Sequence, residues 1–238
     1  MHFFQQAFSD KERPVQVVPK WLILILALAF FTQLSWHSQR PAAIAIATQL
    51  PEPPSTALLQ AVSLDESAAL SRILMFWLQA FDNQPGISLP FSELDYNTIT
   101  AWLERCLQLD KKAQYPLLAA SRLYTQVPDE KKQRIMLEFV HKKFFEDPSS
   151  RWPWLTHAVF VAKHRLKDLE LALSYARSLR IHATAEHVPT WAKQMELFIL
   201  EDLDDVEGAK ILLGGLLESG AIKDPNEIKF LKQRLGVR

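Results

Sequence analysis

The chain has 238 residues, of which 48% are hydrophobic and 23% charged, and this composition excludes a wholly disordered protein. Lys plus Arg and Asp plus Glu number 27 each, so no excess of charge would recruit nucleic acid or an acidic surface. A single cysteine, Cys106, excludes an intramolecular disulfide and a cysteine-rich zinc module. The length suits one domain with an appendage.

The first predicted element is a membrane-spanning helix at Trp21–Trp36, a stretch of sixteen residues without a charge. At ~1.5 Å per residue it covers about 24 Å of a ~30 Å hydrocarbon core, and its terminal tryptophans together with Lys20 and Arg40 can cover the difference. Nine strongly apolar side chains favour insertion by about 3–5 kcal/mol. The alternative is a buried helix of a soluble protein. We favour the span because residues 21–31 include no polar face.

Positive charges set the expected orientation of this span. Lys11, Arg13 and Lys20 precede it, and only Arg40 follows it within twenty residues. The positive-inside rule therefore places residues 1–20 in the cytoplasm and the remainder across the membrane. The alternative is a signal peptide cleaved within residues 43–47. We favour an uncleaved anchor because these residues lie more than ten positions beyond the apolar core.

The expected location is a bacterial inner membrane, with the N-terminus in the cytoplasm and the C-terminal domain in the periplasm. The sequence has no Asn-x-Ser/Thr acceptor and no pair of cysteines, and a simple N-terminal anchor fits that compartment.

A Pro- and Ala-rich tether is predicted at residues 37–56, because four prolines favour extended backbone that would hold the next domain off the bilayer. From there a helical domain is predicted at residues 57–238, since the apolar period is helical nearly throughout. The expected helices lie near residues 57–82, 95–109, 115–126, 128–146, 152–165, 168–181, 189–202, 204–219 and 225–235, with a longer loop at 83–94.

Residues typical of helix starts and helix ends support these boundaries. Two pairs have capping-box spacing, Ser63 with Glu66 and Asp204 with Glu207, and Gly220 is placed to end a helix. Six prolines are expected at helix starts, where the missing N–H costs nothing. They are Pro116, Pro128, Pro148, Pro153, Pro189 and Pro225.

An internal repeat is the most informative pattern in the sequence. Residues 168–172 (DLELA) match residues 205–209 (DVEGA) at a shift of 37, and the same shift places Trp154 on Trp191. The predicted unit is a helix led by Trp, a polar turn, and a second helix whose alanine allows close packing.

In these features the chain resembles the tetratricopeptide (TPR) type of helical-hairpin repeat over roughly residues 95–222. The matching features are the Asp147-Pro148 step, Tyr124 at the end of a first helix, and Ala172 and Ala209 in second helices. The period of about 37 residues, rather than 34, departs from the family. The resemblance implies an all-α fold, an αα-hairpin (TPR-like) solenoid preceded by one transmembrane helix. The alternatives are a general αα-solenoid or an irregular helical bundle.

Chemistry-bearing residues are sparse, and the chain has no P-loop, GxGxxG, GxSxG, HExxH or paired CxxC motif. His157 and His164 share a helix face, with His182 and His187 in the following loop, but neither pair has the i, i+4 spacing of zinc ligands. Cys106 is expected to be a packed thiol. The carboxylates of residues 201–207 are expected to cap and solvate a turn, and the basic residues of 131–143 to form a solvated face. We therefore predict no enzyme activity, no cofactor, no metal, no small-molecule substrate and no nucleic-acid partner.

The predicted function is a membrane-anchored scaffold that binds a protein partner outside the cytoplasm, in envelope assembly or secretion. Stacked hairpins offer an extended surface for such docking. One alternative is a structural subunit of a membrane complex that assembles through its transmembrane helix, and another is an enzyme acting on an envelope polymer. In repeats of the resembling type the first helices line the groove. Alignment on Leu117, Trp154 and Trp191 then gives partner-binding residues Tyr115, Arg122, Gln126, Trp152, Lys163 and Glu196.

Overall fold

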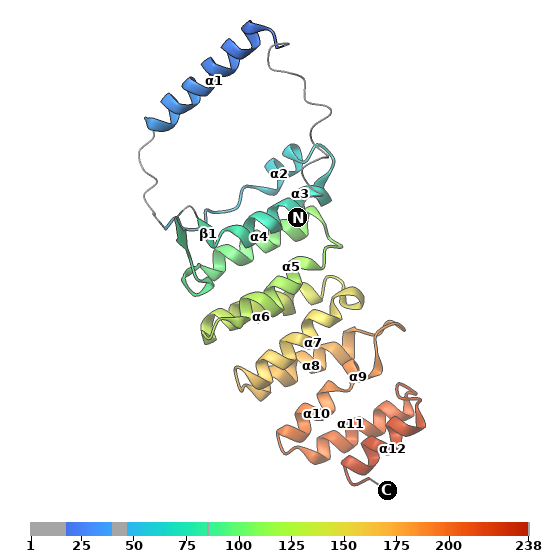
Figure 1. The fold of residues 1–238 in the computed structure, drawn as a ribbon. Coiled ribbons are helices and arrows are strands. Elements are labelled where there is room, and N and C mark those ends of the chain that lie inside the picture. Colours follow the sequence, from blue (N-terminus) through green and yellow to red (C-terminus); the bar gives the residue numbers. More distant parts are fainter. Residues whose placement is uncertain (1–17, 40–46, 85, 238) are drawn as a thin grey trace, which may run out of the picture. The chain divides into compact units, whose positions relative to one another are not determined.

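The computed structural model describes residues 18–39, 47–84 and 86–237. Contacts divide the chain into two compact units, Met1–Ala45 and Ile46–Arg238. Most of the predicted cytoplasmic segment lies outside the described residues, as do the middle of the predicted tether and most of the alternative cleavage site. The described residues are predominantly α-helical, which confirms the all-α prediction (Figure 1).

The described part of the first unit contains one helix, α1 (Lys20–Ser38). Its 19 residues extend the predicted span at both ends and give a length of about 28 Å. None of its residues is buried within the protein. The Thr32 hydroxyl donates to the Leu28 carbonyl oxygen at 2.8 Å, so this polar side chain is satisfied within the helix. By length and composition, α1 can cross a membrane.

The second unit is built from helices joined by mostly short connections. They are α2 (Thr56–Val62), α3 (Ser67–Ala80), α4 (Tyr96–Leu109), α5 (Tyr115–Leu118), α6 (Glu130–Phe144), α7 (Pro148–His164), α8 (Leu169–His182), α9 (Thr190–Lys193), α10 (Met195–Asp202), α11 (Val206–Glu218) and α12 (Pro225–Arg234). The predicted loop at 83–94 contains a small antiparallel hairpin, β1 (Asn83–Gln84) and β2 (Ile87–Ser88), and the 3₁₀ turn η2 (Phe91–Glu93).

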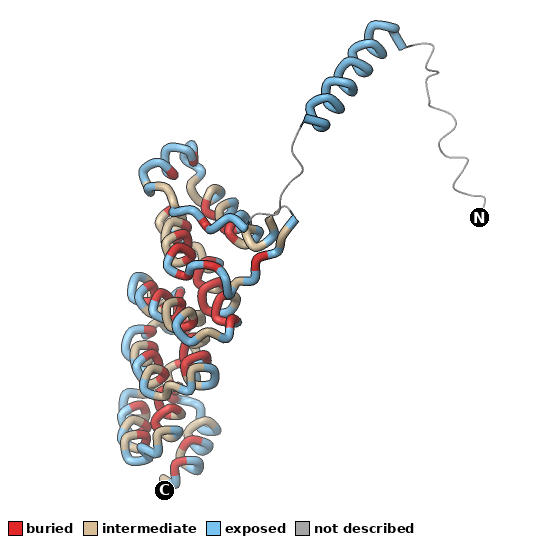
Figure 2. Tube along the Cα trace, turned by 90° about the vertical axis from the view of Figure 1, so that its left-hand side faces the viewer, coloured by how far each residue is buried: buried red, intermediate tan, exposed pale blue. Residues whose placement is uncertain are grey.

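The helices of this unit form a row that follows the order of the sequence (Figure 1). α3 packs on α4, α4 on α6, α6 on α7, α7 on α8, α8 on α10, and α10 on α11. Figure 2 shows buried residues along the inside of this row, where apolar side chains of neighbouring helices meet. They form two clusters. The larger runs from Leu50 to Ile199, and the smaller joins α10, α11 and α12.

Aspartate caps start most of the longer helices of the second unit. In each case the carboxylate accepts a hydrogen bond from a backbone N–H two or three residues later, which stabilises the helix by about 1 kcal/mol. The capping residues are Asp95, Asp129, Asp147, Asp168, Asp205 and Asp224. Because this interaction spans only three residues, the predicted starts of these helices lie within about two residues of the observed ones, except for α7.

Both predicted capping boxes are wrong. Ser63 ends α2 instead of starting α3, because Leu64 and Asp65 have positive φ of 49° and 71° and break the expected helix 57–82 in two. At the second box the cap is Asp205, which accepts from Gly208 N at 2.9 Å, while Asp204 has a φ of 60° and precedes the helix. Gly220, with a φ of 66°, follows the end of α11 as predicted.

Pro153 lies inside α7 and not at a helix start, because α7 begins four residues earlier than predicted, at Pro148. A proline at this position has no N–H for the carbonyl of Ser149, four residues before it. The His187 ring donates from Nε2 to that oxygen at 2.8 Å. A loop histidine therefore satisfies the carbonyl that the proline leaves without its helical partner.

The predicted helix 115–126 is irregular. After α5 the backbone continues as the π-helical turn η3 (Ala119–Leu123) and the 3₁₀ turn η4 (Tyr124–Gln126). The Thr125 hydroxyl donates to Ser121 O at 2.7 Å, and both residues are completely buried. The widened turn therefore places polar groups inside, where they satisfy one another.

The repeated DxExA segments adopt the same local geometry. Asp168 and Asp205 both cap helices, and Ala172 and Ala209 are completely buried. The residues that precede the two caps, Lys167 and Asp204, both have positive φ. The matched tryptophans differ, however. Trp154 is half-buried and donates to Gln114 Oε1 at 2.7 Å, whereas Trp191 is 49% exposed.

The second half of the predicted tether does not act as a spacer, because residues 47–55 pack on the helical unit. Leu50 is buried, Trp102 donates from Nε1 to Pro51 O at 2.8 Å, and Arg105 donates from Nε to Pro54 O at 3.0 Å. Extended proline-rich backbone keeps its carbonyls unpaired, and here side chains of α4 bind them.

Tyr96 and Tyr124 allow a test of how much a hydrogen bond from a buried hydroxyl group contributes to stability. The Tyr96 hydroxyl donates to Tyr124 O at 2.9 Å, while the Tyr124 hydroxyl is buried with no partner in the described chain. We expect Tyr96→Phe to lower the free energy of unfolding by about 1 kcal/mol, and Tyr124→Phe to leave it unchanged or raise it. Urea denaturation of both variants checks this. An equal loss in both would contradict the difference in hydrogen bonding.

Candidate functional site

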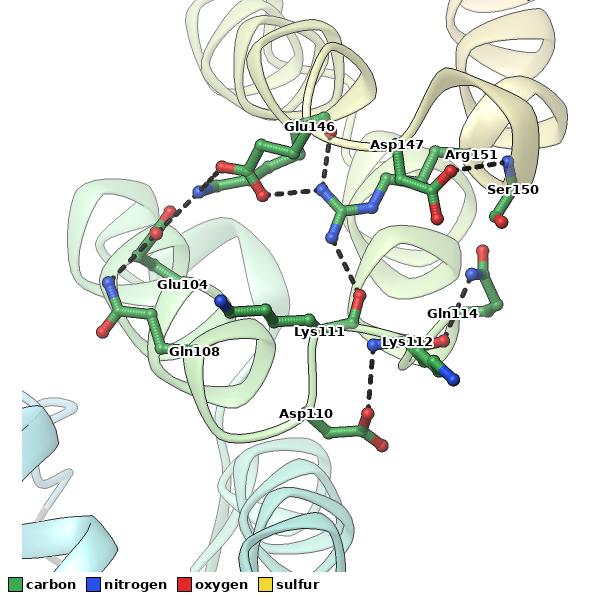
Figure 3. A network of polar contacts seen from close by, with 11 residues as sticks. Glu104, Gln108, Asp110, Lys111, Lys112, Gln114, Glu146, Asp147, Ser150 and Arg151 are labelled. Atoms are coloured by element: carbon green, nitrogen blue, oxygen red, sulfur yellow. Dashed lines mark hydrogen bonds and ion pairs between the residues drawn. The ribbon is translucent and has the colours of Figure 1, made fainter.

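A charged pocket of about 570 Å³ lies where the end of α4, the turn between α6 and α7, and the start of α7 meet. Figure 3 shows its polar contacts from close by. Four cationic and three anionic side chains line it, so it combines dense charge with little net charge. The lining residues are Glu104, Leu107, Gln108, Lys111, Lys112, Lys143, Glu146, Asp147 and Arg151.

Lys143 is buried in the wall of this pocket, with only 4% of its surface exposed. Its Nζ donates to Glu104 Oε1 and to Glu146 Oε1, both at 2.6 Å. Burial alone would lower the pKa of Lys143, but the hydrogen bonds to both carboxylates outweigh it and raise this pKa above its ordinary value. Burial likewise opposes ionisation of Glu146, yet hydrogen bonds from Lys143 and Arg151 lower its pKa.

Arg151 joins three segments of the chain and is only 2% exposed. Its guanidinium donates to Lys143 O at 2.6 Å, to Glu146 Oε2 at 2.8 Å and to Lys111 O at 3.1 Å. In Figure 3 it lies between Glu146 and the Lys111 carbonyl. The start of α7 is fixed beside it, because Asp147 caps this helix by accepting from Ser150 N at 3.2 Å.

This arrangement is that of a structural clamp. A general acid or base works best with a pKa near the working pH, whereas the pKa values of Lys143 and Glu146 are shifted away from neutrality. Both groups therefore stay charged and bound to each other. Lys111 and Lys112 also line the pocket and are exposed, and neither ammonium group forms a hydrogen bond or ion pair within the described chain.

The predicted partner-binding residues lie in α5, in the turns η3 and η4 that continue it, in α7 and in α10. Tyr115 is 41% exposed at the start of α5, and Arg122 is exposed in η3. Gln126 accepts from Arg165 Nη2 at 2.6 Å, and this contact joins the end of η4 to the end of α7.

Two more of these residues join α7 to the helices that follow. Trp152 packs edge-on against Trp191 with ring centroids 5.7 Å apart, and Lys163 forms an ion pair with Asp202. Both side chains are half-buried. They lie on the flank of α7 that faces α9 and α10.

Glu196 differs from the other five, because its side chain is only 3% exposed. Its carboxylate accepts from Arg177 Nε at 3.0 Å and from Arg180 Nε at 2.6 Å. The ion pairs bind α10 to α8, and the carboxylate is not presented on the surface.

The alignment on Trp154 missed Phe160, which is 49% exposed on α7. The His157 ring stacks on the Phe160 ring with centroids 5.8 Å apart, and the His164 ring contacts Phe160 with centroids 4.6 Å apart. The shared face of the two histidines was a correct prediction. The i, i+3, i+7 spacing of all three rings is the signal that identifies this aromatic patch.

The other chemistry-bearing residues are engaged in packing and pairing. Cys106 is fully buried, and burial raises its pKa to about 12, as expected for a packed thiol. No group of three or more potential metal ligands occurs within residues 18–39, 47–84 and 86–237.

The acidic turn and the basic helix also make contacts within the chain. Glu201 binds Arg234 and Asp202 binds Lys163 around the acidic turn. In the basic helix α6, Arg134 pairs with Asp168 at 2.8 Å.

Comparison of the chain with protein-family models, with curated proteins and with solved structures finds no match.

Proposed function

We propose that this protein is a membrane-anchored scaffold whose helical unit is a TPR-like solenoid and binds a protein partner outside the cytoplasm, in envelope assembly or secretion. In this proposal α1 is the anchor in a bacterial inner membrane and the helical unit lies in the periplasm. The apolar sequence and full exposure of α1 support the first part. The positive charges before the span support the orientation.

The observation that carries the proposal is the regular spacing of contacts between successive hairpins. Gln114 binds Trp154, 40 residues later, and Gln126 binds Arg165, 39 residues later. Between the second helices, Glu104 binds Lys143 across 39 residues. Contacts at nearly equal sequence separations, here 39 and 40 residues, are what stacked hairpins produce, since each repeat touches only its neighbours.

Such a stack presents its first helices as one extended surface. We define the first-helix surface by Tyr115, Arg122, Gln126, Trp152, Phe160 and Lys163. It combines exposed aromatic rings with positive charge, and Arg122 has no side-chain partner in the described chain. Aromatic side chains and Arg are the types that dominate binding energy at protein interfaces. The surface therefore suits a peptide segment that carries both apolar and acidic side chains.

The test uses the full chain with a C-terminal tag, crosslinked in native membranes and analysed by mass spectrometry. We expect Arg122→Glu combined with Phe160→Ala to reduce recovery of the captured partner at least tenfold, which corresponds to ~1.4 kcal/mol or more. Ile211→Ala is the matched control, because this side chain is 77% exposed on the second helix α11. Equal recovery with both variants would refute the first-helix surface. Circular dichroism confirms that each variant is folded.

A further inference from the structure

The helix α3 has an unusual outer face. Only Arg72 among its fourteen residues is charged, and its buried side, which includes Met75 and Leu78, packs on α4. The opposite side is also apolar. Ile73 is 61% exposed and Phe76 is 69% exposed. A helix that is apolar on all sides is normally covered on all sides.

We name this outer face the α3 stripe and define it as Ala69, Ile73, Phe76, Trp77 and Ala80. Their spacing of three and four residues places them on one side of the helix, with Arg72 and Trp77 along its two edges. The neighbouring helix α2 adds Leu58 and Val62, which are 55% and 60% exposed, and Leu64 beyond it is 85% exposed. Exposed large apolar side chains thus concentrate at the beginning of the helical unit.

The helix at the other end of the row is more highly charged than α3. The terminal helix α12 carries four charged side chains in ten residues, as a helix in contact with water should. Terminal elements of a helical stack need a polar outer face to remain soluble. The terminal helix α12 exposes one large apolar side chain, Phe230 at 53%, among its charged residues, whereas the α3 stripe exposes Ile73 and Phe76 with no charge between them. A specific cover over α3 explains this better than a general tolerance of exposed apolar surface.

The short connection between α1 and the helical unit indicates what covers the α3 stripe. Only residues 40–46 separate the last described residue of the first unit from Thr48 and its neighbours. At ~3.6 Å per residue, the eight steps from residue 39 to residue 47 reach at most about 29 Å. Thr48 N donates to Gln84 Oε1 at 2.8 Å, which fixes the entry of the chain four residues after the end of α3. If α1 spans the bilayer, the chain that joins it to residue 47 can therefore extend no further than about 29 Å.

We infer that the α3 stripe lies in the interface of the phospholipid bilayer that α1 spans, with the α3 axis in the plane of the membrane. This inference rests on the proposed membrane anchor. Ile73 and Phe76 enter the boundary between headgroups and acyl chains. Trp77 and Arg72 lie at the edges, where an indole ring and a guanidinium favour the headgroup level.

In this inference the α3 stripe binds lipid through apolar contacts, and binding does not require anionic headgroups. Arg72 is the one cation of α3, and Asp65 and Glu66 precede the helix. Insertion of the stripe therefore depends on buried apolar area. We expect zwitterionic and anionic vesicles to support it equally.

The experiment places an NBD fluorophore on Phe76→Cys in the full chain, reconstituted into phosphatidylcholine vesicles that contain a lipid with a nitroxide on its acyl chain. The native Cys106 does not compete, because it is fully buried and its pKa is raised to about 12. The control is the same label on Ile211→Cys, a residue 77% exposed on α11. We expect at least threefold stronger quenching at residue 76 than at residue 211, unchanged when a third of the lipid is phosphatidylglycerol. Equal quenching at both sites would overturn the inference.

Two further readouts separate the remaining outcomes. If a second copy of the chain covers the stripe, the label at residue 76 is shielded from acyl-chain nitroxides, and Ile73→Cys forms a disulfide-linked dimer on mild oxidation. That result overturns the assignment to lipid. Extraction with alkaline carbonate tests the anchor separately. Release of the chain from the vesicles refutes the proposed anchor, and with it the argument from the short connection, whereas a retained chain without quenching refutes the α3 stripe alone.

Discussion

Replacing Arg151 with methionine is expected to lower the free energy of unfolding of the helical unit by about 3 kcal/mol. The arginine is 2% exposed and makes hydrogen bonds to Glu146 and to two backbone carbonyls. Removing one partner from a buried charged network leaves the others unsatisfied, which costs about 3–5 kcal/mol. Methionine retains the length of the side chain, so most of the packing is preserved. Urea denaturation of the full chain in detergent, followed by circular dichroism, measures the change.

The matched control for this prediction is Arg134→Met. Arg134 also makes two ion pairs, with Glu130 and Asp168, but 41% of its side chain is exposed. Exposed pairs contribute about 0–1 kcal/mol because water already solvates both partners. Similar losses in the two variants would show that burial of the pocket network contributes nothing to stability.

Two arginines introduced into α1, Leu26→Arg and Leu28→Arg, are expected to abolish stable membrane insertion. Each arginine near the centre of a span costs roughly 2.5–3.5 kcal/mol, so the pair exceeds the about 3–5 kcal/mol supplied by the apolar residues of the segment. Leu26 and Leu28 are 65% and 67% exposed, so neither substitution disturbs packing within the described chain. We expect the variant in the carbonate-soluble fraction and the wild type in the membrane pellet.

The control for the anchor is Leu26→Val with Leu28→Val, which keeps the segment apolar. It is expected to remain in the membrane pellet. If the arginine variant also stayed there, α1 would not be the element that attaches the chain. The helical unit is expected to fold in both variants, because its core contains no residue of α1.

The packed tether residues change how the anchor and the helical unit are connected. A proline-rich segment predicts extended backbone, and that prediction holds for residues 47–55, which form no helix. The sequence did not indicate that Trp102 and Arg105 would bind the carbonyls of Pro51 and Pro54. The spacer is therefore at most the short stretch before residue 47. The proposal that the α3 stripe lies in the bilayer interface depends on this short spacer.

The positions of the candidate binding residues were predicted only in part. Alignment with the resembling repeats selected residues that lie in α5, η3, η4, α7 and α10, because the positions of helices follow from the apolar period. It selected Glu196, which is buried by Arg177 and Arg180, and it missed Phe160. An error of one position on a helix rotates a side chain by about 100°, which is enough to move it from the surface to the core.

The sequence by itself determined the apolar span, the helical class and most helix starts. Each of these depends on residues within about four positions of one another, such as Asp168 and the backbone N–H of Leu171. Only the tertiary structure decided which distant side chains meet. The pairing of Lys143 with Glu104 depends on how two helices 39 residues apart are rotated and staggered. That choice is made by the packing of whole faces, and no local pattern encodes it.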